Sequence, residues 1–195
     1  MNNELKQLRR LDNEIILVLN KFFHKTYYTD LLAVAVTDRS LKLSRGFKTV
    51  IGSMNSQCAA ILTRCQIDNV ARFHGIRFFE KEAHSYVFQF LDPKSRFRDL
   101  KHKNKQLTDK YLVELLDQQY PKMRILENYE EFCSYVHLSE IQHRACTNMR
   151  VPENEKGFLE FTSHVSEYDL MLDELTYIKL INEFTTIVEI LIKEL

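Results

Sequence analysis

The C-terminal end of the chain carries the pattern that most restricts its fold. Apolar side chains recur there at alternating spacings of four and three residues: Tyr177, Ile181, Phe184, Val188, Leu191 and Leu195. This spacing places them on one face of an α-helix, whereas a strand would divide them between opposite faces. A capping box at Ser166 and Asp169 is expected to begin this helix, which we predict to be the longest in the chain. The apolar face is expected to pack in the core of a helical bundle or, alternatively, along the seam of a homodimer.

The first half of the chain shows the same helical period. Helices are predicted over about residues 3–23 and 31–51, and a third follows a break at 52–56 and continues to about residue 79. The second and third helices are long and are joined by this short break. We therefore expect them to lie antiparallel.

Shorter elements are predicted in the second half. An apolar run over residues 83–91 should end before Pro93, because the residue before a proline is disfavoured in a helix. Thr108 and Asp109 offer an N-cap for a further helix, and Pro121 fits the first turn of the next one. A brief extended segment fits residues 158–162.

Composition supports the helical prediction. Only four Gly and three Pro occur among 195 residues, which leaves little turn chemistry for an all-β fold. The chain is therefore predicted to be all-α: a single helical bundle of five to seven helices, spanning residues 1–195 as one domain, with a long C-terminal helix.

Charge and hydropathy restrict the surroundings in which the chain works. The 27 Lys and Arg balance the 27 Asp and Glu, so any contact with nucleic acid must come from a local patch. No apolar run approaches the roughly 18 residues of a membrane helix, and the N-terminus lacks an apolar signal segment. We expect a cytoplasmic protein that makes no membrane contact.

No metal or cofactor motif is found in the sequence. The four cysteines have neither the spacing of a zinc site nor that of a secreted disulfide framework, which favours buried, reduced thiols. The sequence contains no HExxH motif and no glycine-rich phosphate loop. We therefore expect neither a metal nor a cofactor.

One segment, residues 94–106, is distinctly basic and is predicted to form an exposed loop. Its cationic side chains could attract phosphates in a salt-sensitive way. The candidate RNA-binding residues are Lys94, Arg96, Arg98, Lys101, His102, Lys103 and Lys105.

Three charged residues share one ridge of the predicted third helix. Arg64, Asp68 and Arg72 follow one another at intervals of four residues, so the carboxylate can reach both guanidinium groups. Such a ladder commonly supports an exposed helix. The functional alternative is a half-buried Arg held for a phosphate or for a carboxylate of a partner.

A second polar cluster follows in the helix that begins after Pro121. His137 and Arg144 share a helical face if that helix continues, and Ser139 lies close by in the sequence. A neutral imidazole can take a proton from a hydroxyl group and an Arg can stabilise developing phosphorane charge, which is what metal-free RNA cleavage requires. The alternative is a helix C-terminus at which His side chains cap carbonyls. Together with Arg64 and Asp68, these three are the candidate catalytic residues.

Several motifs in the middle of the chain resemble a known group of proteins. They are Leu107-Thr-Asp-Lys-Tyr-Leu-Val-Glu, Tyr120-Pro121, Tyr129-Glu-x-x-x-Ser-Tyr-Val-His-Leu-Ser139 and the upstream ILTRCQIDNVARF. These segments resemble uncharacterised bacterial helical proteins that are grouped with abortive-infection and HEPN-type domains. HEPN ribonucleases pair an Arg with a His on a helix and dimerise to form their cleft. The strings Arg77-x6-His84 and Arg96-x5-His102 are similar to that pairing.

Two hypotheses for the function follow. In the first, which the resemblance implies, the chain is a bacterial defence or toxin-type effector that binds or cleaves RNA without a metal, as a homodimer. In the second, the same Arg, Asp and His residues form a buried polar network that fixes helix register, and the chain is a non-enzymatic module that binds a partner protein or a second copy of itself.

Overall fold

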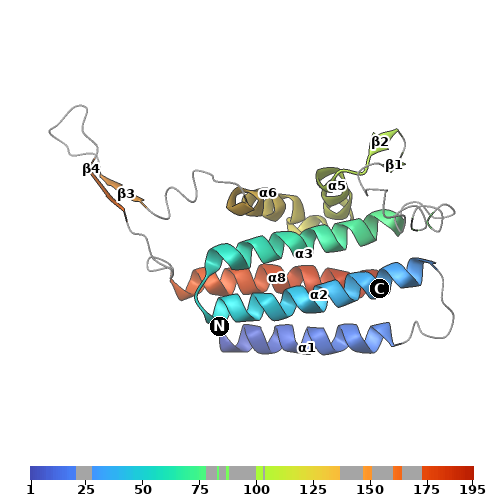
Figure 1. Cartoon of the computed structure of the whole chain (residues 1–195), viewed down its shortest axis with the longest axis horizontal. Coiled ribbons are helices and arrows are strands. Elements are labelled where there is room, and N and C mark those ends of the chain that lie inside the picture. Colours follow the sequence, from blue (N-terminus) through green and yellow to red (C-terminus); the bar gives the residue numbers. More distant parts are fainter. Residues whose placement is uncertain are drawn as a thin grey trace.

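A computed structural model describes residues 1–20, 28–77, 83, 87, 100–102, 104–136, 147–150, 160–163 and 173–195. This part of the chain is predominantly helical (Figure 1). It contains six α-helices: α1 (Asn2–Leu19), α2 (Tyr28–Gly52), α3 (Ser56–Arg77), α5 (Asp109–Gln119), α6 (Ile125–Val136) and α8 (Glu174–Glu194). The short elements are the 3-10 helix η3 (Pro121–Met123) and the strands β1 (Lys101–His102), β2 (Lys105–Gln106), β3 (Thr147–Arg150) and β4 (Glu160–Ser163). The predicted all-α class with a long C-terminal helix is confirmed.

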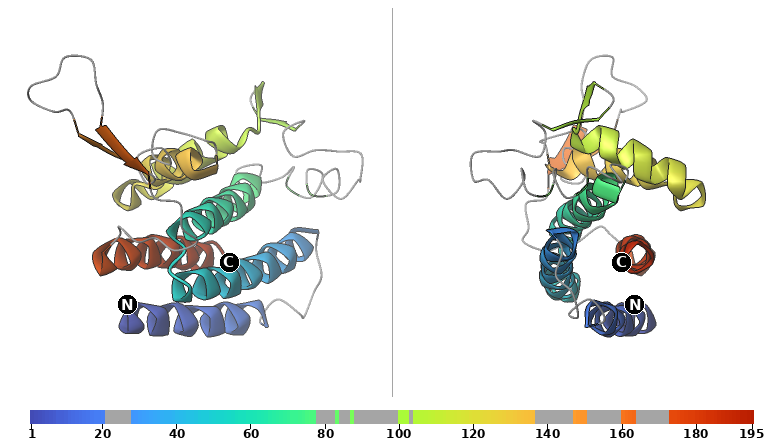
Figure 2. Two further views of the ribbon diagram at one scale, coloured as in Figure 1. Left: turned by 60° about the vertical axis from the view of Figure 1, so that its left-hand side comes forward. Right: turned by 90° about the vertical axis from the view of Figure 1, so that its right-hand side faces the viewer.

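Helix α3 occupies the centre of the bundle. It contacts α2, α5, α6 and α8, and α1 packs against α2 and α8. Both views of Figure 2 place α5 and α6 as a layer over α3, on the side away from α1. Buried residues of all six helices form one hydrophobic cluster. None of the helices in the described ranges is both long and apolar enough to cross a lipid bilayer.

Helices α2 and α3 lie antiparallel, as predicted (Figure 1). The turn between them is closed by backbone hydrogen bonds, and Met54 has the positive φ of 55° that such a tight reversal requires. The Asn55 side chain then accepts a hydrogen bond from the Cys58 amide at 2.9 Å. This bond satisfies one of the free N–H groups at the beginning of α3.

The apolar stripe of α8 packs inside this chain. Tyr177, Ile181, Phe184, Val188 and Leu191 are buried. The Phe184 ring stacks on Phe47 of α2 with ring centres 4.2 Å apart. The bundle-core interpretation is therefore confirmed for these residues.

Two details predicted for α8 differ from the structure. The helix begins at Glu174, where the Asp173 side chain accepts a hydrogen bond from the Thr176 amide at 2.9 Å, while Ser166 and Asp169 lie outside the described residues. With 21 residues it is shorter than α2, which has 25. The prediction that it is the longest helix is wrong, because α2 begins at Tyr28 and takes Asp30 into its first turn, where a carboxylate favours the helix dipole.

The segment between α5 and α6 also differs from the prediction. Thr108 caps α5 as expected, accepting a hydrogen bond from the Tyr111 amide at 3.3 Å. Pro121, however, begins the 3-10 helix η3 and not an α-helix. The reason is Arg124, whose left-handed backbone (φ 51°, ψ 41°) interrupts the helical path before α6 begins.

The basic segment contains a small hairpin where a loop was predicted. Strands β1 and β2 pair antiparallel, and Asn104 adopts φ 65° in the turn between them. Asn tolerates this left-handed conformation better than most residues. Strand β4 pairs with β3 and confirms a brief extended segment at residues 160–162; residues 158 and 159 lie outside the described ranges.

Candidate functional site

Arg64 lies on the face of α3 that α6 covers. Its Nη1 forms an ion pair with the Asp68 carboxylate one turn along α3. Its Nε donates to Cys133 Sγ on α6 at 3.2 Å. The guanidinium carbon lies 3.7 Å from the centre of the Tyr129 ring, which is cation–π distance. Three side chains thus surround Arg64, and only 11% of its side chain is exposed.

Burial controls the charges in this cluster. Desolvation raises the pKa of the Asp68 carboxyl, and the lowering effect of Arg64 only partly offsets it. Desolvation also raises the pKa of Tyr129 to about 12. Burial by itself would lower the pKa of Arg64, but the bonds to Asp68 and Cys133 outweigh it and raise that pKa. At neutral pH the cluster therefore contains a cationic Arg64 beside a neutral phenol.

Arg72, one turn further along α3, binds the next helix. Its Nε and Nη2 donate to Asp109 Oδ1 at 2.9 and 2.8 Å. Both side chains are 36% exposed, so solvent weakens this pair more than the pair at Arg64. Asp109 was predicted only as part of an N-cap. The spacing of residues along one helix cannot show that Arg72 pairs with a carboxylate on a different helix.

Helix α6 places both of its contacts over Arg64. Tyr129 and Cys133 are four residues apart and so share one face of the helix. The first turn of α6 is held to α5, because the Leu126 amide donates to Asp117 Oδ1 at 3.1 Å. The predicted meeting of the Arg64 helix with the helix that leads toward His137 is therefore found.

The structure describes only part of the predicted site. Arg64 and Asp68 contact each other, whereas His137, Ser139 and Arg144 lie outside the described residues, which end on α6 at Val136. Among the predicted RNA-binding residues, Lys101, His102 and Lys105 lie in the β1–β2 hairpin. The remaining ones, Lys94, Arg96, Arg98 and Lys103, lie outside the described ranges, as does His84.

The hairpin borders a hollow of about 530 Å³ at the beginning of α5. Lys105 Nζ lies 5.2 Å from the centre of the Tyr111 ring. Lys110 also lines the hollow and forms an ion pair with Glu130 at 3.0 Å. The hollow thus combines cationic groups with an aromatic face.

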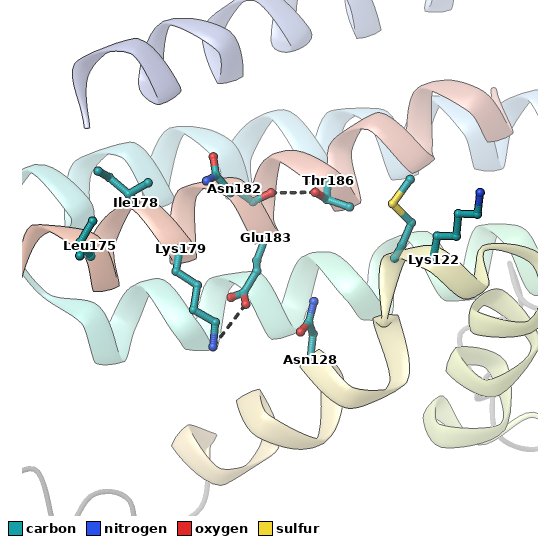
Figure 3. Close-up of a pocket in the computed structure, with 9 residues that line it drawn as sticks. Lys122, Asn128, Leu175, Ile178, Lys179, Asn182, Glu183 and Thr186 are labelled. Carbon is teal, nitrogen blue, oxygen red and sulfur yellow. Dashed lines mark hydrogen bonds and ion pairs between the residues drawn. The ribbon is translucent and has the colours of Figure 1, made fainter.

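A surface groove of about 430 Å³ separates α8 from η3 and α6 (Figure 3). Side chains from both walls line it: Lys122, Met123, Asn128, Leu175, Ile178, Lys179, Asn182, Glu183 and Thr186. No pattern in the sequence indicates this groove, because its lining residues alternate with core residues on elements that are far apart in the chain.

Polar groups in this groove are incompletely paired. Lys179 Nζ lies 3.2 Å from the Glu131 carboxylate on α6 and 3.6 Å from Glu183 Oε1. Burial raises the pKa of Glu183, which is only 13% exposed, and Lys179 offsets part of that effect. The second carboxylate oxygen of Glu183 is buried and has no hydrogen-bond partner within the described ranges.

A buried polar triad at the end of α8 was also missed. His74 Nδ1 lies 2.9 Å from Glu194 Oε2, and the Tyr120 hydroxyl donates to Glu194 Oε1 at 2.6 Å. Only 7% and 5% of the His74 and Glu194 side chains are exposed. Enclosed in this way, the triad ties the end of α8 to α3 and to the end of α5.

Metal ligation finds no support in the described part of the chain. No three His, Cys, Asp or Glu side chains are grouped there as a metal site. Cys58, Cys65 and Cys133 are free, half-buried thiols. Comparison of the chain with protein-family models, curated proteins and solved structures found no match.

Proposed function

We propose that this chain is a non-enzymatic module that binds a partner protein through the α6–α8 groove. The observation that carries the proposal is unused hydrogen-bonding capacity in the lining. Within the described structure the Lys122 ammonium and the side-chain amides of Asn128 and Asn182 line the groove and have no hydrogen-bond or ion-pair partner. These groups can bind polar groups of a partner, and the apolar side chains beside them provide surface that binding would bury.

The surroundings of Arg64 favour this proposal over RNA cleavage. A catalytic Arg must direct N–H groups at an open position where charge develops. Here one group faces Asp68 and another faces Cys133, and the Tyr129 ring covers the guanidinium plane. Such an arrangement supports a structural role in joining α3 to α6.

Selection from a displayed library of random peptides, with the whole chain as bait, tests the proposal. Asn182→Arg should fill the groove and weaken the selected peptides at least about ten-fold. Gln118→Arg, the same kind of change at an exposed amide on α5, should leave binding unchanged. Circular dichroism would check that both variants fold. If no peptide is enriched, or if Asn182→Arg binds the peptides as tightly as wild type, the proposal is wrong.

RNA binding is a second candidate, favoured by the hollow at the β1–β2 hairpin. Lys105 and Lys110 can contact phosphates there, and Tyr111 can stack on a base. This candidate agrees with the resemblance to HEPN-type defence and toxin effectors. We expect Lys105→Gln to weaken binding of a mixed RNA pool and to reduce its salt dependence.

Cleavage of the same RNA pool, without metal, tests the catalytic form of the second candidate. The first proposal expects none. Cleavage by wild type that is lost in both His137→Ala and Arg64→Ala would instead favour the effector hypothesis.

A further inference from the structure

The chemical character of the lining changes along the α6–α8 groove, from apolar at one end to cationic at the other. Apolar Leu175 and Ile178 line one end, Lys179 and Glu183 lie in the middle, and Lys122 lies at the other end (Figure 3). Building on the proposed function, we infer that the partner is an extended peptide segment with an apolar side chain at one end and a carboxylate at the other.

The length of the groove sets the length of the segment. From Leu175 to Thr186 the lining advances eleven residues along α8. At about 1.5 Å per helical residue this is roughly 16 Å, which an extended peptide covers in about five residues at about 3.3 Å each. A segment of this length can contact both ends of the groove together.

The middle of the groove fits a peptide backbone better than a cationic side chain. Lys179 already supplies positive charge to Glu183 and Glu131, so a second ammonium would lie close to it. Asn128 and Asn182 each offer a donor and an acceptor, which match the alternating N–H and C=O groups of an extended chain.

The two ends distinguish the terminal side chains of the segment. Leu175 is 71% exposed, and a bound apolar side chain would remove that surface from water. Lys122 is exposed, and none of the described residues pairs with it, so it can receive a carboxylate. The charge order of the groove therefore favours an apolar-to-acidic segment over a basic one.

Randomised pentapeptides displayed on phage, selected against wild type and against charge variants, test the order directly. Wild type should enrich an apolar residue at one end and Asp or Glu at the other. Lys122→Glu should change the second preference to Lys or Arg and weaken the original peptides about five-fold, the scale of one exposed ion pair. Lys6→Glu, a charge reversal at an exposed position on α1, should leave both preferences unchanged.

The outcomes separate this inference from the proposed function. The inference would be overturned, and the binding function left intact, if the peptides that Asn182→Arg weakens had basic ends. The same holds if their acidic preference were unchanged in Lys122→Glu. Dimerisation of wild type that Asn182→Arg abolishes would also overturn it, in favour of a second copy of the chain. Absence of any groove-dependent peptide would overturn both.

Discussion

Removing Arg64 alone should cost more stability than removing Arg64 and Asp68 together. Arg64→Met takes away the charge that partly compensates the burial of Asp68, which is only 17% exposed. The carboxylate then remains between α3 and α6 without its ion-pair partner. In the double variant Arg64→Met/Asp68→Leu, apolar side chains of similar volume occupy the same space, and no charge is left buried.

The size of the effect follows from the burial of the pair. Removing one partner of a fully buried ion pair lowers the free energy of unfolding by about 3–5 kcal/mol. Replacing both partners by apolar residues is often neutral or stabilising. Here 11% and 17% of the two side chains are exposed, so we expect about 2–3 kcal/mol for the single variant. At roughly 2–4 °C per kcal/mol for a chain of this length, Tm should fall by about 4–12 °C. The double variant should lie within about 1 kcal/mol of wild type.

The dependence on pH provides an independent check. Because the folded-state pKa of Asp68 is raised, Asp68 keeps its proton to higher pH in the folded chain than in the unfolded chain. The cost of ionising Asp68 is therefore fully present above the raised pKa and disappears as pH falls below the ordinary value of 3.8. In Arg64→Met that pKa should rise further, so the deficit relative to wild type should shrink on acidification.

Urea unfolding followed by circular dichroism, at neutral and at acidic pH, measures these differences. Arg72→Met is the control, because its pair with Asp109 is 36% exposed on each side and should contribute less than about 1 kcal/mol. A single variant that loses no more stability than this control would refute the reasoning. So would a double variant less stable than the single one.

Substitutions at three further positions test the packing and capping of the helices by thermal unfolding. Gly75→Ala should destabilise by about 1–3 kcal/mol, because the added Cβ would lie 2.3 Å from Leu112 Cδ2 on α5; an unchanged Tm would mean that α3 and α5 do not approach this closely. Gly46→Ala is the opposite case, because the added Cβ would make an ordinary contact with Leu62 Cδ1 at 3.5 Å. We expect it to stabilise the fold by about 0.5–1 kcal/mol. A loss of stability would count against the described packing of α2. Thr108→Ala should cost about 1 kcal/mol through loss of the cap of α5, and Thr108→Ser should restore most of it.

The fold was predictable where one helix contains its own information. The stripe from Tyr177 to Leu191 repeats with the helical period, and burial confirms it. The Thr108 side chain caps α5, as predicted. Arg124 shows the limit of this approach, because its left-handed backbone ends the helical path without a glycine to mark the position.

The candidate site was predictable only along α3. The spacing of four residues gave the Arg64–Asp68 pair. It could not predict that Tyr129 and Cys133 contact Arg64. The face of α6 that covers Arg64 depends on the direction in which η3 leads into α6. For the same reason no pattern in the sequence indicated that His74 and Glu194 meet.

The polar side chains of α3 explain why this helix has one position relative to each neighbour. Apolar ridges can slide by a turn at modest cost, whereas a hydrogen bond to one particular partner fixes the register. Each of the four helices that contact α3 receives at least one such bond or ion pair: Gln66 to Ser40 and Asn69 to the Val36 carbonyl on α2, Arg72 to Asp109 on α5, Arg64 to Cys133 on α6, and His74 to Glu194 on α8. Arg64 thus belongs to a set of polar contacts that join α3 to its neighbours. The α6–α8 groove differs, because Lys122, Asn128 and Asn182 line an open surface there. A rigid arrangement around α3 would hold both walls of the groove in place for the proposed partner.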